Sequence, residues 1–443
     1  MRRPQLAEFM RRMDKDSVAV ITSAPEAVRS NDTHYRYRQD SDFFYLTGLD
    51  EPDSVAVIRP AHPDHPYTLF VRPRDPERET WEGRRAGVEG ARELYGADAA
   101  HPVEEFGEKL GGLLDGARNV YYRLGARAEL DGLLVKQIGA MRQRGRTQRA
   151  PDSITDPGVI LSEMRLVKTP DEIELMQRAA DIAAEAHVEA MRAARPGMYE
   201  YEIEALVEYV FRRRGAAGPA YTSIVGGGAN ATVLHYVTND SALRDGELLL
   251  IDAGCEFKGY ASDITRTFPV ANRFTAAQRE IYSVVLEAQL ACVEMARPGV
   301  TMEDLNERAV RMLTDGMLRL GLLRGDAEKL IEGKEYRKFF MHGLGHFLGL
   351  DVHDVGRYQL DDGPRKLAPG NVITVEPGLY VGAEAEGVPD RFRGVGVRIE
   401  DDVLITEDGR RVLTDKVPKQ IDEIEALTAR AASDNATSEV RRR

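Results

Sequence analysis

A helix-start signal at residues 169–172 (TPDE) is the feature that most constrains how this 443-residue chain can fold. Its threonine can cap a helix, its proline suits the first helical turn, and its two acids match the helix dipole. An amphipathic pattern continues to about Arg195 and stops at Pro196-Gly197. Because the chain is too long for one ordinary hydrophobic core, we place a domain boundary just before this helix. We expect a first domain over residues 1–165 and a second over residues 166–428.

Short apolar segments alternate with a helical pattern in the first domain. Ser17–Thr22, Asp53–Ile58, Tyr67–Val71 and Val120–Arg123 each predict a strand. Leu130–Met141 has the spacing of an amphipathic helix. Strands that alternate with helices are typical of an α/β domain.

Longer elements fill the second domain. Helices are predicted over Glu200–Arg214, Ala276–Ala296 and Met302–Leu320. Strands are predicted over Leu248–Asp252, Ile373–Val381 and Val395–Thr406. The fold class of the whole chain is therefore α/β (α+β), and the polar tail over residues 429–443 is expected to be disordered.

Composition excludes several classes of protein. The net charge of -13 argues against a general nucleic-acid binder, which would carry a basic face. No segment approaches the roughly 20 apolar residues that span a bilayer, so we expect no membrane partner. The basic N-terminus lacks the apolar core of a secretory signal. With two cysteines only, Cys255 and Cys292, a disulfide framework is not expected and a cytoplasmic location is.

Two aspartates in the segment LLLIDAGCEFKGYASDITRTFPV suggest a cation site. Asp252 ends an apolar strand, and Asp263 follows eleven residues later. A turn at Phe257–Gly259 would place the two opposite each other on one face of a hairpin. Carboxylates so placed repel, and a cation between them turns that repulsion into binding. Taken singly, each aspartate is explained more simply as a turn or capping residue.

Three histidines, His342, His346 and His353, fall within twelve residues in MHGLGHFLGLDVHDVG, although the chain has only nine. Imidazole is the commonest nitrogen ligand of metals in proteins. The spacing of His342 and His346 would suit one side of a helix, but three nearby glycines disfavour a helix. The alternative is a solvated histidine loop without a ligand.

Two glutamates complete the candidate set. Glu376 closes a strand before Pro377-Gly378, and Glu400 is predicted inside a strand, with Arg398 two residues earlier on the same face. Each alone is more simply an ordinary strand acid. Together, the four carboxylates carry four negative charges, which two divalent cations would cancel, and the imidazole adds one nitrogen ligand. Such oxygen-rich ligands favour Mn²⁺, Co²⁺ or Mg²⁺ over a thiolate zinc site, and paired metals serve hydrolysis.

These segments resemble a known family. IDAGCEFKGYASDITRTFPV, HGLGHFLGLDVHDVG, TVEPGLY and GVGVRIEDDVLIT are similar to the metallopeptidases of pita-bread fold, and most similar to aminopeptidase P, the Xaa-Pro aminopeptidases. The resemblance runs from DTHYRYRQDSDFFYLTG, which begins at Asp32, to the 420s. It implies a creatinase-like N-terminal domain before a pita-bread catalytic domain. It also implies an enzyme that releases the first residue of peptides with proline second.

The resemblance implies roles for individual residues. The metal ligands it implies are Asp252, Asp263, His346, Glu376 and Glu400, with Asp263 and Glu400 bridging two ions. Manganese is expected, with cobalt or zinc as alternatives. Glu376 would also be the acid/base residue. His235, His342 and His353 would contact the substrate and stabilise charge in the reaction.

Further positions are implied at the substrate end of the site. Tyr221, Arg398 and Asp32 resemble residues that form a gate, and Trp81 resembles a tryptophan that a neighbouring subunit supplies. A homo-oligomer, dimer or tetramer, is therefore expected. From the residues alone, Tyr221 would be a core aromatic and Trp81 a loop anchor.

Two other functions fit the same residues. A prolidase, which cleaves only Xaa-Pro dipeptides, shares the fold and the metal ligands. A non-catalytic pita-bread module that binds proteins is a different class, but such a module would be expected to have lost ligands. Creatinase shares the domain arrangement and lacks the metal ligands, which argues against it.

Overall fold

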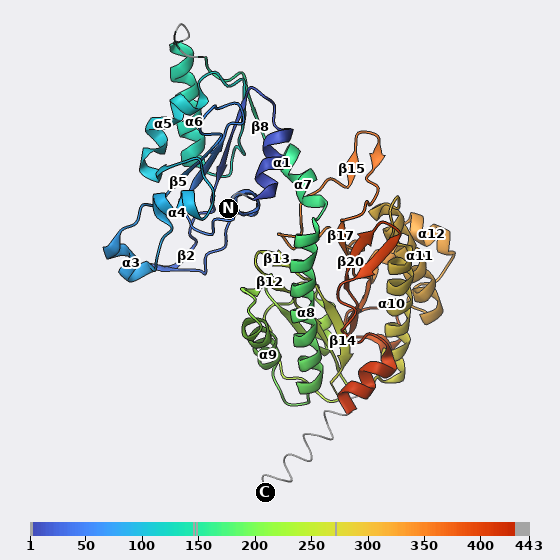
Figure 1. Cartoon of the computed structure of the whole chain (residues 1–443). Helices are drawn as coiled ribbons and strands as arrows, with labels where there is room; N and C mark the ends of the chain where they lie inside the picture. Colours follow the sequence, from blue (N-terminus) through green and yellow to red (C-terminus); the bar gives the residue numbers. More distant parts are fainter. Residues whose placement is uncertain (1–2, 145–146, 148, 271–272, 430–443) are drawn as a thin grey trace. The chain divides into compact units, whose positions relative to one another are not determined.

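The computed structural model describes residues 3–144, 147, 149–270 and 273–429. The chain divides into two compact units, Met1–Met164 and Arg165–Arg443, which we describe separately (Figure 1). The tail that we expected to be disordered begins at residue 429, and residues 430–443 lie outside the described residues. None of the helices in the described part is long and apolar enough to cross a membrane.

The first unit is built on a six-stranded sheet in the order β6-β5-β4-β1-β7-β8. The strands are β1 (Ser17–Thr22), β4 (Val55–Ile58), β5 (Tyr67–Val71), β6 (Ala99–Pro102), β7 (Asn119–Tyr121) and β8 (Ser153–Thr155). Strand β4 runs antiparallel to β1 and β5, whereas β1–β7, β5–β6 and β7–β8 are parallel. The predicted strands and the α/β character of this unit are confirmed, with shifts of one or two residues at β4 and β7.

Helices pack on this sheet because their apolar faces need cover. Helices α5 (Phe106–Leu114) and α6 (Ala128–Gln143) share a core with the strands, where Leu110 and Ile138 meet Val18 and Val57. The remaining elements are α1 (Pro4–Arg12), α2 (Ser41–Thr47), α3 (Pro76–Glu82), α4 (Gly87–Glu93), α7 (Gly158–Leu166), β2 (Val28–Ser30) and β3 (Thr33–His34).

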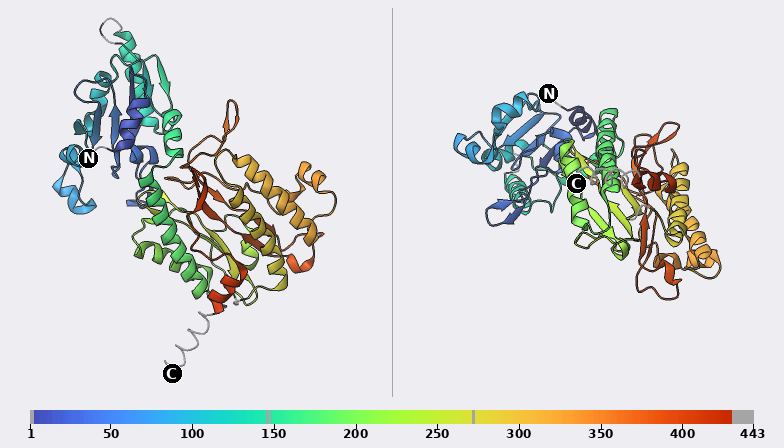
Figure 2. Two further views of the ribbon diagram at one scale, coloured as in Figure 1. Left: turned by 45° about the vertical axis from the view of Figure 1, so that its right-hand side comes forward. Right: turned by 90° about the horizontal axis from the view of Figure 1, so that it is seen from below.

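The second unit has two helix pairs and several small sheets. The helices are α8 (Pro170–Ala193), α9 (Glu200–Arg213), α10 (Ala276–Met295), α11 (Met302–Leu320) and α12 (Ala327–Glu332). Thr169 and Glu172 form the predicted capping box at the start of α8. Helices α8 and α9 pack against strands of the first half of the unit, and α10 against strands of the second half (Figures 1 and 2).

The strands of this unit pair in short antiparallel ladders. They are β9 (Gly218–Pro219), β10 (Ile224–Gly227), β11 (Leu248–Asp252), β12 (Cys255–Phe257), β13 (Tyr260–Ala261), β14 (Thr265–Pro269), β15 (Gln359–Leu360), β16 (Gly363–Pro364), β17 (Val372–Val375), β18 (Gly378–Val381), β19 (Val395–Arg398), β20 (Asp401–Thr406) and β21 (Gly409–Val412). The sheets run β10-β11-β14, β13-β12-β9, β17-β20-β21, β18-β19 and β15-β16. A large core with residues from α8 to α11 lies between the helices and these strands.

The hairpin that carries the two aspartates has a different register from the one predicted. Phe257 pairs with Tyr260 around a two-residue turn at Lys258-Gly259, where both φ angles are positive, 51° and 87°. Asp252 therefore pairs with Thr265 and not with Asp263. The predicted pairing of Asp252 with Asp263 is wrong by two positions, because the turn is centred on Lys258-Gly259, one residue later than that pairing requires. Because side chains alternate with period two, Asp263 still shares a face with Asp252, as a diagonal neighbour.

Both predicted strands of the C-terminal half are interrupted at the same level. Strands β17 and β18 replace the strand predicted over Ile373–Val381, and β19 and β20 replace the one over Val395–Thr406. Pairing passes from Val375↔Asp401 to Gly378↔Arg398 across the gap. Pro377 lies in this gap and has no N–H to donate to a ladder. Glu400 thus lies at a strand break, not inside a strand as predicted.

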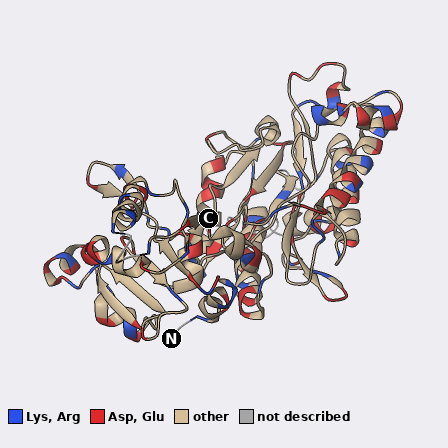
Figure 3. Ribbon diagram, turned by 90° about the horizontal axis from the view of Figure 1, so that it is seen from above, with Lys and Arg blue, Asp and Glu red and all other residues tan. Residues whose placement is uncertain are grey.

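Charged residues of both signs are intermixed along the helices (Figure 3). Arg311 pairs with Glu328 and Arg319 with Glu287, each on the exposed surface of the second unit. Such exposed pairs contribute little to stability, about 1 kcal/mol or less each.

Candidate metal centre and active site

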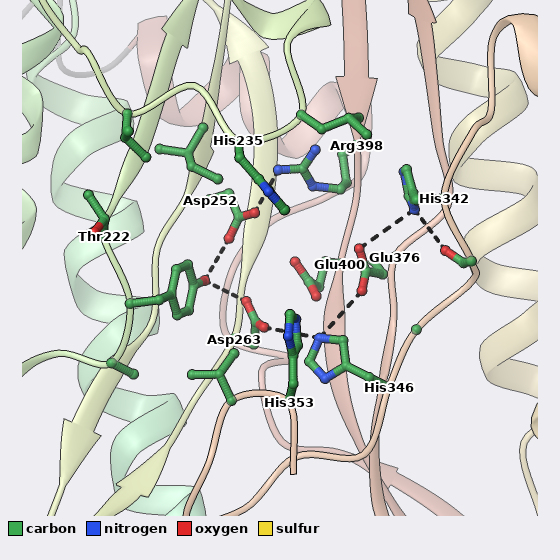
Figure 4. Close-up of a pocket in the computed structure, with 18 residues that line it drawn as sticks. Thr222, His235, Asp252, Asp263, His342, His346, His353, Glu376, Arg398 and Glu400 are labelled. Carbon is green, nitrogen blue, oxygen red and sulfur yellow. Dashed lines mark hydrogen bonds and ion pairs between the residues drawn. The ribbon is translucent and has the colours of Figure 1, made fainter. Parts of the chain in front are cut away.

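A cavity of about 630 Å³ opens in the second unit and collects most of the predicted site residues (Figure 4). Ten of them line it: Tyr221, His235, Asp252, Asp263, His342, His346, His353, Glu376, Arg398 and Glu400. They come from segments almost 180 residues apart in the chain, so only the fold brings them together. The remaining lining includes apolar side chains, among them Leu234, Val237 and Val352.

Strand ends place the four carboxylates. Asp252 is the last residue of β11, and Asp263 lies two residues before β14. Glu376 follows β17 directly, and Glu400 directly precedes β20. A residue at a strand end is released from the alternating pattern, so its side chain can turn into a pocket that a ladder residue could not reach.

His346 faces the carboxylates with one ring nitrogen. Its Nε2 lies 3.5 Å from Asp263 Oδ2 and 3.5 Å from Glu376 Oε1. Its Nδ1 lies 3.0 Å from the Phe347 carbonyl oxygen, and since a carbonyl can only accept, Nδ1 is the donor. This leaves Nε2 as the atom that can bind a metal. One ligand atom each from Asp263, His346 and Glu400 lies within 4.8 Å of the others, as a shared ion requires.

Asp252 is held by two neighbours. Arg398 donates to its Oδ2 at 2.6 Å, and the Tyr221 hydroxyl lies 2.6 Å from its Oδ1. The same hydroxyl lies 2.5 Å from Asp263 Oδ1. A tyrosine hydroxyl has one proton and cannot donate to both carboxylates. The Oδ1 atom that does not receive this proton lacks a donor from Tyr221, and a cation between the two carboxylates would compensate its charge.

Burial gives these carboxylates an electrostatic cost. Burial and the neighbouring acids raise the pKa of Glu376 to about 7, and they raise those of Asp263 and Glu400 as well. Buried carboxylates are unfavourable unless they are paired or coordinate metals. The donor set, mostly oxygen with one imidazole, therefore fits divalent metal ions.

Two residues that the sequence did not single out support this site. The Tyr380 hydroxyl accepts from Arg398 Nη1 at 2.9 Å and lies 2.8 Å from His342 Nε2. Thr265 Oγ1 donates to Glu400 at 2.6 Å and accepts from Arg398 Nε at 3.0 Å. Both lie in the segments that carry the family resemblance, but only tertiary contacts reveal their partners.

The three further histidines differ in surroundings. His342 donates through Nδ1 to the Gly343 carbonyl oxygen at 2.7 Å, and burial together with Arg398 lowers its pKa to about 4. It is therefore neutral, and its Nε2 accepts from Tyr380. His353 packs edge-on against His346, with ring centroids 4.4 Å apart. His235 and His353 are exposed at the pocket, on loops, and Figure 4 shows them approaching the carboxylates from different segments.

Asp32 and Trp81 are not brought into this pocket. Asp32 is exposed in the turn between β2 and β3, and Trp81 is 88% exposed on α3. Both belong to the first unit, whereas every residue that lines the cavity belongs to the second. Their predicted roles remain predictions.

Comparison with known proteins places both units in one family. The model of metallopeptidase family M24 matches residues 174–407, and that of the aminopeptidase P N-terminal domain matches residues 2–121. The Xaa-Pro aminopeptidase of Escherichia coli is 47% identical over 433 residues, covering 96% of this chain and 98% of that protein.

Solved structures agree with this assignment along the whole chain. Aminopeptidase PepP of Pseudomonas aeruginosa superposes with a TM-score of 0.95 at 47% identity, covering 97% of each chain. Zinc-substituted E. coli aminopeptidase P in complex with product gives 0.93 at 46% identity, covering 96% of this chain and 97% of that one. The expected two-domain architecture, with a pita-bread second domain, is thus confirmed. This chain belongs to metallopeptidase family M24, as a two-domain, metal-dependent Xaa-Pro aminopeptidase.

Proposed function

We propose that the chain binds two divalent metal ions through Asp252, Asp263, His346, Glu376 and Glu400 and hydrolyses the bond before proline at a peptide's N-terminus. The observation that carries this proposal is the convergence of four buried or half-buried carboxylates and His346 Nε2 in one cavity. When bound, such ions polarise a carbonyl group and provide a nucleophilic hydroxide near neutral pH.

Manganese is the ion we propose for these ligands, with cobalt or zinc as alternatives. Four carboxylates and one imidazole suit a hard or borderline cation, and no thiol is among the residues that line the cavity. A related E. coli structure is described as zinc-substituted, so zinc can occupy the site of that relative. Activity measured after adding Mn²⁺, Co²⁺ or Zn²⁺ to the metal-stripped protein would rank the three.

The substrate's amino group is proposed to bind beside Asp252. Arg398 and Tyr221 hold the two oxygens of this carboxylate, at 2.6 Å each, and fix its direction. The free amino group of a peptide is a cation at neutral pH, so a fixed carboxylate is a suitable partner. This contact would make the enzyme an aminopeptidase, because an internal peptide segment has no such group.

Two histidines are proposed to act on the scissile carbonyl. His235 and His353 reach the pocket from different segments, and each can donate a hydrogen bond to an oxygen that gains negative charge. His342 stays neutral and is fixed by Tyr380 and Gly343, so it can orient a substrate group without carrying charge.

Glu376 is proposed as the acid/base residue. Thr374 Oγ1 lies 3.3 Å from its Oε1 and donates one hydrogen bond, which leaves the carboxylate facing the cavity. In this role Glu376 takes a proton from the attacking water and passes it to the leaving prolyl nitrogen. The nitrogen of the scissile bond belongs to proline and carries no N–H before cleavage, so the proton delivered by Glu376 lets it leave as a secondary amine.

The apolar part of the cavity suits a proline ring. Leu234, Val237 and Val352 offer hydrocarbon surface beside the polar cluster. A pyrrolidine ring presents no donor and loses nothing by contact with such a wall. Peptides with proline second are thus the proposed substrates, and longer peptides are preferred over the dipeptides that a prolidase would cleave.

Paired substrates test this specificity. Xaa-Pro and Xaa-Pro-Xaa peptides would be compared at saturating Mn²⁺, with release of the first residue as the readout. We expect faster turnover of the tripeptides. Activity confined to dipeptides would establish the prolidase alternative instead.

Metal analysis separates the enzyme from a non-catalytic binding module. We expect about two divalent ions per chain after saturation and removal of excess metal. A protein that retains none would be a scaffold. We also propose a homo-oligomer in which Trp81 of one subunit and Asp32 take part in the substrate site, and light scattering tests the oligomeric state. The proposed location is cytoplasmic.

A further inference from the structure

The loop between residues 346 and 354 carries two histidines of the site but has almost no regular secondary structure. Phe347 forms a single bridge with Ile373, and the chain then turns through bends to His353. Gly345 and Gly349 add backbone freedom that must be removed when the loop is ordered. Something besides a ladder must therefore fix the two imidazole rings.

A buried ionic cluster at Asp354 provides that anchor. Asp354 Oδ1 accepts from Arg165 Nη2 at 2.6 Å, and its Oδ2 accepts from Lys168 Nζ at 3.0 Å. The side chains of Asp354 and Lys168 are each 1% exposed, and that of Arg165 is 3% exposed. Arg165 Nη2 also lies 2.6 Å from Asp351 Oδ2, so two cations meet two carboxylates. Because these charges balance, each buried charge has an opposite partner within the cluster.

The anchored residue is joined directly to both histidines. Asp354 follows His353 in the chain, and its backbone N–H donates to the Phe347 carbonyl oxygen at 2.9 Å. The same carbonyl accepts from His346 Nδ1 at 3.0 Å. A displacement of Asp354 would thus move His353 by one peptide bond and disturb the acceptor that orients His346. Figure 4 shows the two rings next to each other at one side of the cavity.

Close packing allows this cluster little freedom. A Cβ added to Gly349 would lie 2.2 Å from Asp354 Oδ2 and 2.9 Å from Lys168 Cε. The Asp354 carboxylate and the end of the Lys168 side chain are therefore packed closely against the loop backbone at Gly349. The Lys168 backbone is fixed in turn, because its N–H donates to the Gly370 carbonyl oxygen at 2.8 Å.

We propose that Asp354, clamped by Arg165 and Lys168, is a positioning residue that sets the orientation of His353 for the reaction. Asp354 is not among the residues that line the cavity, so it acts through the loop. The inference rests on the role proposed above for His353, and it assigns a reason for burying two cations that the hydrolytic chemistry does not use.

A double-mutant cycle with Lys168→Met and His353→Ala tests this inference. Methionine keeps the apolar stem of the lysine but removes its charge. For a tripeptide with proline second, at saturating Mn²⁺, we expect Lys168→Met to lower kcat roughly tenfold, because misplacing a catalytic group by a fraction of an ångström has effects of this order. KM, manganese content and circular dichroism should stay close to those of the unchanged protein. In the His353→Ala background, the same substitution should change kcat less than about twofold, since the group it positions is gone.

The cycle distinguishes failure of the inference from failure of the proposed function. If Lys168→Met lowers kcat by the same factor in both backgrounds, or if it lowers manganese content, the cluster does not act through His353. If His353→Ala alone has unchanged kcat, the role proposed for His353 is wrong and the inference falls with it.

Two further variants guard against effects on folding. Asp351→Asn removes only the outer partner of Arg165, at a side chain that is 38% exposed, and should fold even if Lys168→Met does not. A smaller loss of kcat that disappears in the His353→Ala background would support the inference, and an equal loss in both backgrounds would overturn it. Lys416→Met removes an exposed ion pair with Asp181 and is the matched control, for which we expect unchanged kcat.

Discussion

At the scale of single residues, the site is defined by carboxylates whose neighbours differ. Asp252 is fixed by Arg398 and Tyr221, whereas Glu376 has one hydrogen bond from Thr374 and an imidazole at 3.5 Å. The first arrangement holds a charge in place, and the second leaves an oxygen able to exchange a proton. This difference in partners is why we assign binding to one acid and proton transfer to the other.

Glu376→Gln tests the second assignment. The amide keeps the shape of the side chain but cannot take up a proton, so we expect kcat to fall by about 10²–10⁴-fold. Steady-state kinetics on a tripeptide with proline second would be combined with metal analysis of the same sample. Glu384→Gln, at an exposed residue, serves as the control and should leave kcat unchanged. An unchanged kcat in Glu376→Gln with full metal content would contradict the assignment.

His187 offers a residue-scale prediction about pH. It is buried on α8, 2.9 Å from the Ala253 carbonyl oxygen, and burial lowers its pKa to about 4. An unfolded histidine has a pKa near 6.5, so between these values the unfolded chain binds more protons than the folded one. This histidine therefore stabilises the fold less as pH falls from about 6.5 toward 4.

His187→Gln should remove this part of the pH dependence. We expect the difference in unfolding free energy between the two proteins to change by up to roughly 1.4 kcal/mol per pH unit within that window. Urea unfolding at several pH values would measure it. His65→Gln, at an exposed histidine of the first unit, should show no such change. Parallel curves for His187→Gln and the unchanged protein would refute the prediction.

At the scale of elements, local signals predicted the long helices α6, α8, α9, α10 and α11, whereas the shorter helices were not predicted. The start of α8 was predictable because capping, proline and acidic residues act within one turn, and the bounds of α11 agree with the prediction. Strand register was less predictable: a two-residue turn at Lys258-Gly259 moved Asp252 opposite Thr265. The sequence is compatible with turns of several lengths. Only the backbone angles of the folded turn decide which register forms.

The end of a strand at Glu376 was indicated locally by Pro377-Gly378, but the break at Glu400 was not. Only the pairing of the two segments shows that the ladder is interrupted there. The roles of Tyr380 and Thr265 were missed for the same reason, since their partners lie in other segments. The metal-binding candidates were predictable because several uncommon residue types coincide in a few short segments.

Two glycines that precede His346, Gly343 and Gly345, lead to a prediction about the fit of this segment against β17. A Cβ at Gly345 would lie 2.0 Å from the Thr374 carbonyl oxygen, whereas one at Gly343 would meet nothing within 4 Å. Thr374 N–H donates to the His346 carbonyl oxygen at 2.8 Å, so Gly345→Ala must push the loop from β17. We expect this overpacking to lower the free energy of unfolding by about 1–3 kcal/mol. We also expect it to weaken manganese binding. Gly343→Ala is the matched control two residues away and should change both far less; equal effects would show that the close approach at Gly345 is unimportant.

At the scale of the whole molecule, each unit has its own hydrophobic core, but the second also contains buried carboxylates that repel one another. The first unit has a core of its own between its sheet and α5 and α6. The second places carboxylates from the end of β11 and from the segments beside β14, β17 and β20 around one cavity. Their mutual repulsion lowers the stability of this unit when no cation balances it, so metal binding and folding are linked there.

Metal removal should therefore lower the melting temperature of the second unit. At a manganese concentration about 100 times the dissociation constant, one site adds about 2.7 kcal/mol, which corresponds to a shift of roughly 5 °C or more for a unit of this size. Calorimetry with excess Mn²⁺ and after dialysis against a chelator would measure the shift. Asp263→Asn removes a carboxylate that faces His346 Nε2 and that we propose as a metal ligand. The melting temperature of this variant should therefore respond little to Mn²⁺. A large response that survives in Asp263→Asn would mean that manganese stabilises the protein elsewhere, and the metal centre would have to be sought outside this cavity.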